Sequence, residues 1–336
     1  MATLVTGGAG YIGSHTAVAL HEAGRDVVVI DNLSHASVKA IDAVRSLTTP
    51  DLVFVEGDLL DTETLDRVFS THDIDEVVHF AAYKAVGESV EKPLDYYRNN
   101  LGSTINLADA MAAHGVGRLV FSSSCTVYGQ PEENPVTEAA PTGAESPYGW
   151  TKYMSEQILA DAARALPIDV VLLRYFNPVG AHPSGSIGED PTGIPNNLVP
   201  FVMQVAVGRL DKVRVFGADY PTRDGSGVRD YIHVMDLAEA HVAALDALAG
   251  GLRGATPVNI GTGVGNSVLE VIEAAGAAVG TPIPYEIVER RPGDIAETWA
   301  ATERAAELLG WRATRGLDEM LRDHWRWQSN NPNGYV

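Results

Sequence analysis

The chain is poor in cysteine and in positive charge. Its 336 residues include one cysteine, Cys125, and 24 lysines and arginines against 44 acidic residues, a formal net charge of −20. A lone cysteine excludes an internal disulfide and suits a reducing compartment, so we expect a cytoplasmic protein. So negative a chain is unsuited to nucleic acid or an anionic membrane as its main partner. An anionic ligand therefore requires arginine or lysine side chains gathered locally.

Long apolar runs are also absent. The apolar stretches are no longer than a strand, which excludes a transmembrane helix. The first predicted strand begins at Thr3, which leaves no room for a charged leader and a cleavage site. With 45% hydrophobic residues and mixed charge, the composition is that of a soluble globular enzyme. We expect no membrane and no nucleic acid among its partners.

Glycine, by contrast, is abundant, with 33 residues, and three glycines share one turn near the start. Residues 3–6 are apolar and β-branched, as in a buried strand, and a helical pattern follows Gly13. Gly7 permits a sharp turn, Gly10 the approach of a pyrophosphate, and Gly13 close helix–strand packing. Strand, turn and helix in this order form the context of a dinucleotide-binding fingerprint, although the spacing is GxxGxxG rather than GxGxxG.

The next strand decides between a dinucleotide site and an ordinary structural turn. Asp26–Asp31 is apolar between its ends, and Asp31 closes it 18 residues after Gly13. An acidic side chain there accepts hydrogen bonds from a ribose diol and repels a 2′-phosphate. The three residues that follow contain no arginine to accept such a phosphate. The sequence therefore favours NAD over NADP.

Strands and helices alternate through the first half of the chain. Further strands are predicted at 52–58, 74–80, 118–124 and 168–176, and helices at 94–114 and 150–165. This alternation predicts a Rossmann-type, doubly wound parallel sheet in an NAD-binding domain over 1–177. A stretch rich in proline and glycine at 177–197 is predicted to be a long loop.

A smaller mixed α/β domain that binds the substrate is predicted over 178–336. Its predicted elements are a helix at 198–208 and strands at 213–216 and 283–288. Segments near 229–262, with a helix at 234–248 and a strand at 257–260, are expected to return to the first domain.

Several polar or apolar features allow two interpretations. Asp58, just past a predicted strand, contacts an adenine or caps the next helix, and Lys84 is a cation at the site's rim or a solvated loop charge. The helix at 94–114 has an apolar face that packs within the chain or against a second subunit. That face comprises Leu94, Tyr97, Leu101, Ile105, Ala108 and Met111.

Tyr148 and Lys152 share one face at the start of a predicted helix. Such a pair is ordinary on a surface, but this one follows Ser124, which ends a strand at the edge where open α/β sheets bind ligands. A tyrosine base needs a pKa about 3 units below its ordinary value of ~10. A nearby ammonium and a positively charged nicotinamide can supply that shift. Ser124 would hold a substrate hydroxyl and relay its proton, whereas Cys125 is interpreted as a packing residue.

With these residues in place, the chain resembles the extended short-chain dehydrogenase/reductase family and, within it, the bacterial UDP-glucose 4-epimerases almost from end to end. The resemblance is carried by the stretches LVTGGAGYIGSHT, HFAAYKAVGESVEKPLDYY, FSSSCTVYG, SPYGWTK, RYFNPVGAHPSG, GIPNNLVPF, DGSGVRDYIHVMDLA and RRPGD. It implies interconversion of UDP-galactose and UDP-glucose by transient oxidation at sugar carbon 4. NAD takes the hydride, the 4-keto sugar turns, and the hydride returns to its other face.

The resemblance also implies roles for individual residues, a homodimer and no metal. The implied catalytic residues are Ser124, Tyr148 and Lys152. The implied cofactor-binding residues are Gly7, Gly10, Tyr11, Ile12, Gly13, Asp31, Asn32, Asp58, Leu59, Phe80, Ala81, Ala82, Lys84, Asn99, Ser122, Tyr148, Lys152 and Phe176. The implied substrate-binding residues are Lys84, Ser124, Tyr148, Asn177, Asn197, Leu198, Phe216, Arg229, Arg291, Asp294 and Thr298.

Three other functions compete with this one. The related 4,6-dehydratases need an acid where this chain has Cys125 and Thr126, and neither is a carboxyl group. A net dehydrogenase or reductase would consume free cofactor stoichiometrically. A redox-sensing NAD-binding regulator would not need an intact set of Ser124, Tyr148 and Lys152.

Thr298 departs from the pattern of the relatives restricted to glucose and galactose, which often have tyrosine there. The smaller side chain leaves room for a 2-acetamido group, so we expect UDP-N-acetylhexosamines to be substrates as well. The alternative is that a neighbouring side chain fills the space.

Overall fold

A central parallel sheet organises the computed structural model, which describes residues 2–291 and 293–335. Seven strands lie in the order β10-β6-β5-β4-β1-β2-β3. Their bounds are β1 Ala2–Thr6, β2 Asp26–Asp31, β3 Val53–Glu56, β4 Ile74–His79, β5 Arg118–Ser122, β6 Asp169–Tyr175 and β10 Ala255–Ile260. The chain changes direction across the sheet between β1 and β4, which places a ligand crevice at their carboxyl ends. The predicted doubly wound parallel sheet is confirmed.

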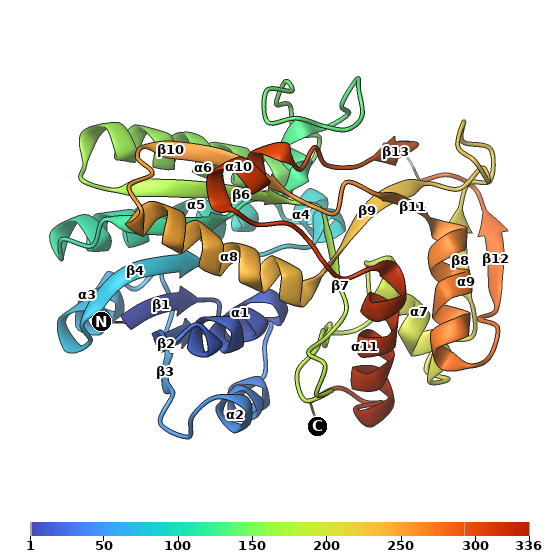
Figure 1. Ribbon diagram of the computed structural model, residues 1–336, viewed down its shortest axis with the longest axis horizontal. Helices are drawn as coiled ribbons and strands as arrows, with labels where there is room; N and C mark the ends of the chain where they lie inside the picture. The colour runs from blue at the N-terminus through green and yellow to red at the C-terminus, as the bar shows by residue number, and fades with distance from the viewer. Residues whose placement is uncertain (1, 292, 336) are drawn as a thin grey trace.

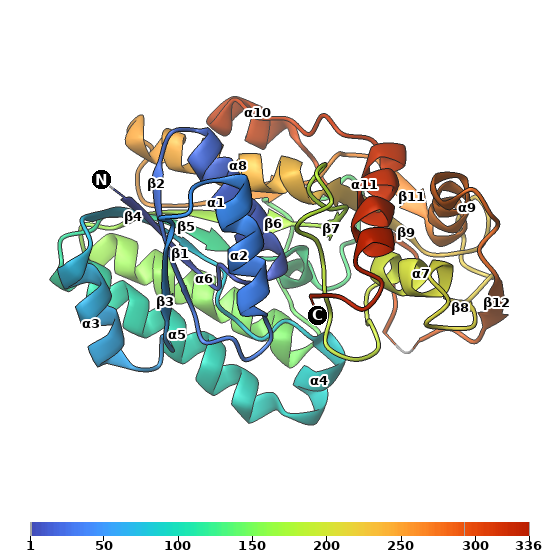
Figure 2. The ribbon, with the colours of Figure 1, turned by 90° about the horizontal axis from the view of Figure 1, so that it is seen from below.

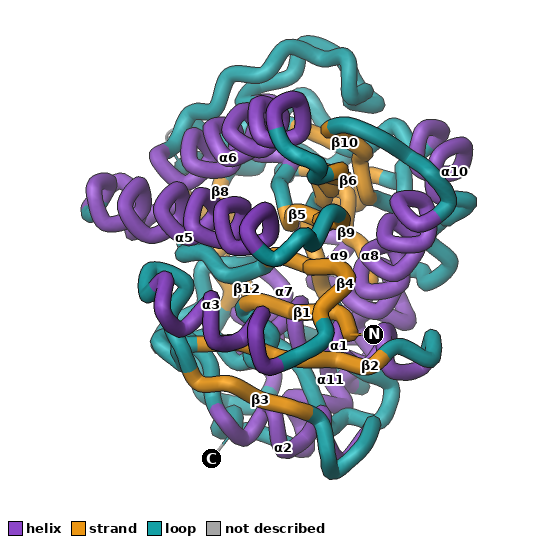
Figure 3. Tube along the Cα trace, turned by 90° about the vertical axis from the view of Figure 1, so that its left-hand side faces the viewer, coloured by secondary structure: helices purple, strands orange, loops and turns teal. Residues whose placement is uncertain are grey.

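Helices cover both faces of this sheet, as Figures 1 and 3 show. One face packs against α1 (Tyr11–Glu22), α2 (Val38–Leu47) and α8 (Val234–Ala249), around an apolar core that includes Val18, Ile41 and Leu237. The other face packs against α3 (Thr62–Thr71), α5 (Pro93–Ala113) and α6 (Pro147–Ala165). Apolar runs in the strands, buried on both sides, are what such a parallel sheet requires. The short helices α4 (Val86–Glu91) and η1 (Cys125–Tyr128) lie in its connections. The short helix α10 (Glu303–Leu309) follows the last strand of this sheet in the chain and packs against α8 and β10.

The remaining elements gather at one end of the molecule (Figures 1 and 2). One small sheet joins β7 (Asn177–Val179), β9 (Val228–His233), β11 (Gly265–Ser267) and β13 (Glu297–Thr298), and a second pairs β8 (Val213–Phe216) with β12 (Tyr285–Val288). With them lie α7 (Leu198–Ala206), α9 (Val268–Val279) and α11 (Leu317–Asn330). Their shared apolar core is separate from the two cores of the large sheet.

The structure corrects two expectations about local elements. The loop predicted at 177–197 begins with the short strand β7, which pairs with β9 far along the chain. In α5, Leu94 is 63% and Ile105 42% exposed, and only the last two residues of the predicted apolar stripe are buried. The helix instead buries the polar residues Asn100 and Thr104, because they form hydrogen bonds with α6, such as that from Asn100 to Thr151 at 2.9 Å.

Candidate active site

A cleft of about 480 Å³ opens at the carboxyl ends of β1, β2, β4 and β5. With one exception, every predicted cofactor residue lines it. These residues are Gly7, Gly10, Tyr11, Ile12, Gly13, Asp31, Asn32, Asp58, Leu59, Phe80, Ala81, Ala82, Lys84, Asn99, Ser122, Tyr148 and Lys152. The exception, Phe176, is buried in an apolar cluster with Val127 and Tyr128. Phe176 is therefore not among the residues that line the cleft.

The glycine turn leaves space at the base of this cleft. Gly7 has a φ of +69°, and a Cβ there would lie 2.7 Å from the backbone nitrogen of Ala81. No side chain caps α1 at Gly10, and its first turn has no acidic residue. The amide groups at the start of the helix are thus available to a phosphate, with the positive end of the helix dipole behind them. This geometry fits the pyrophosphate of a dinucleotide.

Asp31 and Asp58 line the cleft beside the glycine turn. Asp31 accepts backbone hydrogen bonds from Ala9 and Leu33, at 3.1 and 2.8 Å, and burial raises the pKa of its carboxyl. Asp58 accepts a hydrogen bond from the side chain of Asn32 at 2.9 Å. Asp61, rather than Asp58, caps α3. The capping interpretation of Asp58 is therefore wrong, and its side chain belongs to the cleft wall.

Lys84 forms an ion pair across the mouth of the cleft. Its Nζ lies 3.2 Å from Oε1 of Glu189, a residue that is 4% exposed, and 5.9 Å from the centre of the Tyr11 ring. Tyr11 in turn donates its hydroxyl hydrogen to the carbonyl of Gly180 at 2.7 Å. Lys84 is therefore more than a solvated loop charge.

Tyr148 and Lys152 project from the first turns of α6 into the same cleft. Ser146 caps this helix by accepting a hydrogen bond from Gly149 N at 3.1 Å. Tyr148 is 7% and Lys152 4% exposed. The Lys152 ammonium donates to the carbonyl of Ser122 at 2.7 Å and lies 6.0 Å from the centre of the Tyr148 ring. Ser124, 6% exposed, is hydrogen-bonded to Tyr148.

Burial shifts the pKa values of both groups against their charged forms. It raises the pKa of Tyr148 well above its ordinary value, and the hydrogen bond with Ser124 opposes that rise. It lowers the pKa of Lys152 to about 8, and the charge of Glu156 opposes that fall. The chain alone therefore does not lower the pKa of Tyr148, and the predicted lowering depends on two positive charges acting together. Of the two positive charges invoked, only the ammonium is part of the chain.

A buried ion pair lies directly beneath these groups. Arg174 on β6 donates to both carboxylate oxygens of Glu156 on α6, at 2.9 and 2.6 Å, and the two residues are 6% and 1% exposed. Ser123 also donates to Glu156, and Arg174 donates to the Tyr128 hydroxyl at 3.0 Å. The pair thus connects the helix that carries Lys152 with both ends of the turn that carries Ser124.

Most predicted substrate residues lie outside the cleft, on the smaller sheets and their connections. Arg229 on β9 forms an ion pair with Asp294, and the guanidinium of Arg291 lies 3.8 Å from the centre of the Phe216 ring. Thr298 on β13 pairs with Arg229 in register and is 8% exposed. Asn177 begins β7, and Asn197 and Leu198 begin α7. Of the substrate set, only Lys84 and Tyr148 line the cleft itself.

Several cleft residues have no counterpart among the predictions. Tyr83, Tyr175 and the stretch Gly188–Asp190 line it, as does Tyr335 near the far end of the chain. Tyr175 was detectable as the neighbour of Phe176, and its hydroxyl lies 2.6 Å from Ser122 Oγ. Tyr83 was likewise detectable, since it lies between the predicted residues Ala82 and Lys84. The others belong to loops without a local motif, so the sequence alone did not indicate them.

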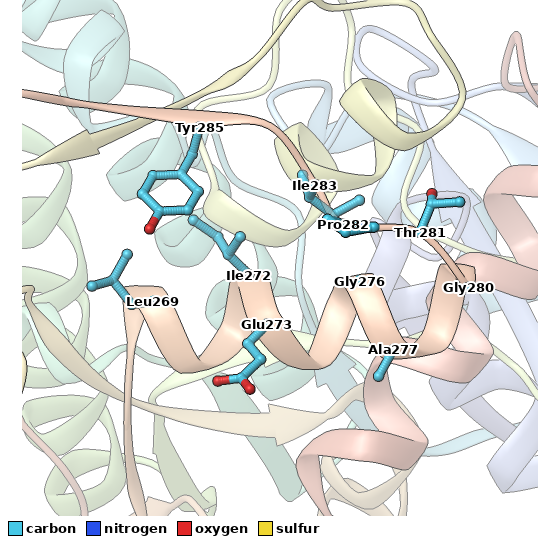
Figure 4. Close-up of a pocket in the computed structure, with 10 residues that line it drawn as sticks. All are labelled: Leu269, Ile272, Glu273, Gly276, Ala277, Gly280, Thr281, Pro282, Ile283 and Tyr285. Atoms are coloured by element: carbon cyan, nitrogen blue, oxygen red, sulfur yellow. The ribbon is translucent and has the colours of Figure 1, made fainter.

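A second hollow of about 580 Å³ lies on the smaller end of the molecule, between α9 and the turn into β12. Figure 4 shows Leu269 and Ile272 on its floor and Glu273 as the one charged side chain in its lining. A lining without a cation does not suit a diphosphate.

Among the described residues, no three His, Cys, Asp or Glu side chains are grouped to hold a metal. No helix among residues 2–291 and 293–335 is long and apolar enough to cross a bilayer.

Comparison with known proteins places these features in a family. The model of the NAD dependent epimerase/dehydratase family matches residues 3–261. The chain is 58% identical to the UDP-glucose 4-epimerase of Bacillus subtilis (strain 168), over 100% of this chain and 99% of that protein. It is similar to the crystal structure of the Bifidobacterium longum UDP-glucose 4-epimerase in complex with NAD+ and UDP, with a TM-score of 0.95, 51% identity, and 99% and 100% of the two chains covered. The UDP-Glc/GlcNAc 4-epimerase of Campylobacter jejuni has a TM-score of 0.85 and 36% identity, over 98% and 99% of the chains.

Proposed function

The chain belongs to the NAD dependent epimerase/dehydratase family, and we propose that Ser124, Tyr148 and Lys152 are the catalytic residues of a sugar-nucleotide epimerase. Its reaction is the NAD-dependent interconversion of UDP-galactose and UDP-glucose, an isomerisation. The observation that carries the assignment of residues is the buried Tyr148–Lys152 pair, which projects into the same cleft as the glycine turn.

Tyr148 acts as the acid and base of this reaction. NAD, held by the residues that line the cleft, would supply the hydride chemistry at sugar carbon 4. Tyr148 removes the proton from the 4-hydroxyl as the carbonyl forms and returns that proton as the carbonyl is reduced, so neither redox equivalents nor protons are consumed. Its burial supports this role because bulk water is kept away from the proton that Tyr148 exchanges with the sugar hydroxyl.

Lys152 and Ser124 tune and orient this tyrosine. The positive charge of Lys152 favours the phenolate. Ser124, hydrogen-bonded to Tyr148, is placed to hold the sugar hydroxyl and pass its proton on. Because burial raises the pKa of Tyr148, its lowering requires the positive nicotinamide in addition to Lys152.

Charged residues of the smaller part are proposed to hold the UDP group. Guanidinium groups match the oxygens of a diphosphate, which makes Arg229 and Arg291 suitable partners. Asp294 is proposed to hold the uridine ribose hydroxyls. The ion pair between Arg229 and Asp294 supports this assignment. Arg291 belongs to the same turn as Asp294, whose backbone N donates to the carbonyl of Arg291 at 3.2 Å.

We also propose that the enzyme accepts UDP-N-acetylhexosamines, because Thr298 is smaller than the tyrosine expected in a glucose- and galactose-restricted enzyme. A neighbour in structure, from Campylobacter jejuni, is named a UDP-Glc/GlcNAc 4-epimerase. The proposal is contradicted if UDP-N-acetylgalactosamine turns over at less than about a thousandth of the rate of UDP-galactose, because one substituent seldom costs more than that unless the site rejects it.

A homodimer in the reducing cytoplasm is proposed as the working form. An apolar surface on α5 and α6 supports the dimer: Leu94 and Ile105 are exposed on α5, and Trp150 and Met154 on α6. Ile105→Asp should shift the protein toward monomers in sedimentation experiments. The single cysteine, whose pKa burial raises to about 12, supports the compartment and supplies no acid for a dehydratase.

The experiment that tests the function is incubation of the purified protein with UDP-galactose, without added NAD. We expect UDP-glucose to form with no net NADH. Stoichiometric NADH would indicate a net dehydrogenase, and no conversion even with NAD added would contradict the epimerase.

A further inference from the structure

One wall of the cofactor cleft is a loop that the glycine fingerprint does not account for. Gly188, Glu189 and Asp190 line this wall, close to Tyr11 and Lys84. Lys84 ties the loop to the cofactor side of the cleft through its 3.2 Å ion pair with Glu189. The wall therefore presents two carboxylates to a cleft that is suited to an anionic diphosphate.

Segment 331–335 and α11 hold the same loop from behind. Tyr335 N donates to Oδ2 of Asp190 at 2.8 Å, and its hydroxyl accepts from Gly188 N at 3.2 Å. Trp327 on α11 donates its ring N–H to the carbonyl of Glu189 at 3.2 Å, and its ring centre lies 4.6 Å from that of Tyr335. The side chains of Tyr335 and Trp327 thus hold Gly188 and Glu189, and the backbone amide of Tyr335 holds Asp190. Figures 1 and 2 both show the end of the chain beside the loop that precedes α7.

Gly334 and the side chain of Asp190 are in close contact. Gly334 has a φ of +80°, and a Cβ there would lie 2.1 Å from Oδ1 of Asp190. The carboxylate of Asp190 therefore rests on the backbone of Gly334 and points at the amide of Tyr335. Lys84 forms an ion pair with Glu189. Among the described residues, the side chain of Asp190 accepts hydrogen bonds only from this segment. If the segment is displaced, an unengaged carboxylate faces the diphosphate, and like charges repel.

We propose that segment 331–335, anchored by Tyr335, is a positioning element of the NAD site: it fixes the wall at 188–190 and restrains Asp190, and so slows the release of NAD. Tyr335 is a positioning residue, since it acts through Gly188 and Asp190. The inference rests on the proposed function in that NAD is the resident cofactor.

The test compares NAD release from two variants with release from two matched controls. Tyr335→Ala removes the anchor, and Gly334→Ala pushes a methyl group onto Asp190. Tyr285→Ala removes a half-exposed tyrosine far from the cleft, and Gly208→Ala places alanine at a φ of +79° with no atom within 4 Å of its Cβ. The measurements are the NAD content of the purified proteins and the rate of NAD release after gel filtration.

The anchor variants should release NAD about tenfold faster than the unmodified protein, the equivalent of about one lost hydrogen bond. The controls should stay within about twofold. In Asp190→Asn/Tyr335→Ala, removal of the charge should restore most of the retention, which a purely structural defect would not allow. Release within twofold for both anchor variants overturns the proposal.

If Tyr335→Ala does not fold, Tyr335→Phe is used in its place, since it removes only the hydrogen bond from Gly188. Faster release of NAD from this variant supports the proposal, and unchanged release overturns it. The epimerase assay is separate. If the unmodified protein retains NAD but does not convert UDP-galactose, the proposed function is contradicted. The ratio of NAD release rates between variant and unmodified protein still tests the role of segment 331–335 in that case.

Discussion

The half of the molecule around the large sheet, called the cofactor half, differs in how its predicted site is assembled from the smaller half proposed to bind the substrate, called the substrate half. Around the large sheet, the turn after β1, the ends of β2 and β4 and the start of α6 bring almost every predicted cofactor residue into one cleft. On the smaller sheets, the predicted substrate residues come from β7, β8, β9, β13 and a turn, and they meet in pairs such as Arg229 with Asp294.

This difference has a physical cause. In a parallel sheet the carboxyl ends of consecutive strands meet at one edge, so residues just after each strand are neighbours by construction. The smaller part has no such rule, because its strands pair across large separations in sequence: β7 with β9, and β9 with β13. The four predictions below test whether chemistry, support and selectivity divide between the halves in this way.

The largest effect is expected at the point where the two halves meet. Tyr148→Phe should preserve the fold and reduce turnover of UDP-galactose by about 10²–10⁴-fold, the usual contribution of a general base. Tyr153→Phe, on the same helix but outside the cleft lining, is the control and should be near normal. Turnover of Tyr148→Phe close to that of the unmodified enzyme would remove Tyr148 from its proposed role.

The next effect concerns the support beneath the cofactor half. Arg174→Met leaves Glu156 buried without its partner and should lower the free energy of unfolding by about 3–5 kcal/mol. Arg253→Met breaks an exposed pair with Asp169, whose side chains are 66% and 26% exposed, and should cost less than about 1 kcal/mol. Urea denaturation of both variants measures the two losses in unfolding free energy. Equal losses would show that the buried pair contributes no more to stability than the exposed one.

Acid should destabilise both halves through their buried histidines. Burial lowers the pKa values of His15 and His79 to about 3, and those of His241 and His324 to about 4. Below an unfolded pKa of about 6.5, the unfolded chain binds more protons than the native one, so stability falls as the pH falls toward 4.

A single histidine variant sharpens this comparison. Each such residue contributes about 1.4 kcal/mol per pH unit in that range. His324 is the one of the four on α11, in the substrate half, and neither of its ring nitrogens has a hydrogen-bond partner. His324→Phe should reduce the slope of unfolding free energy against pH by about one proton. An unchanged slope between pH 6.5 and 4.5 would contradict the prediction.

The smallest effect is expected in the substrate half and concerns selectivity alone. Thr298→Tyr should reduce turnover of UDP-N-acetylgalactosamine by about 10–100-fold, because the larger ring occupies the space proposed for the acetamido group, and should leave UDP-galactose within about threefold. Thr298→Ser is the control and should retain both activities. Equal losses for both substrates would indicate general damage to the site.

Most of the fold and most of the cofactor cleft could be predicted, because both depend on local patterns. Asp31 follows from its place at the end of an apolar strand, and the Tyr148–Lys152 pair from its spacing on a helix. The buried face of α5 could not be predicted, since polar residues there are buried only because α6 supplies their hydrogen bonds. Phe176 was assigned to the cleft lining, but its neighbour Tyr175 occupies that position, because successive side chains of a strand point to opposite faces.

The sequence by itself determined the class of fold, the kind of cofactor and the pairing of Tyr148 with Lys152 on one helix face, since these are encoded in local patterns of strand, turn and helix. Tertiary structure alone decided what surrounds them. It buried Tyr148 and Lys152, placed Glu156 and Arg174 beneath them, and brought Tyr335 against a loop 145 residues earlier in the chain. Burial and long-range contact depend on how distant segments pack, and no local pattern of residues specifies that packing.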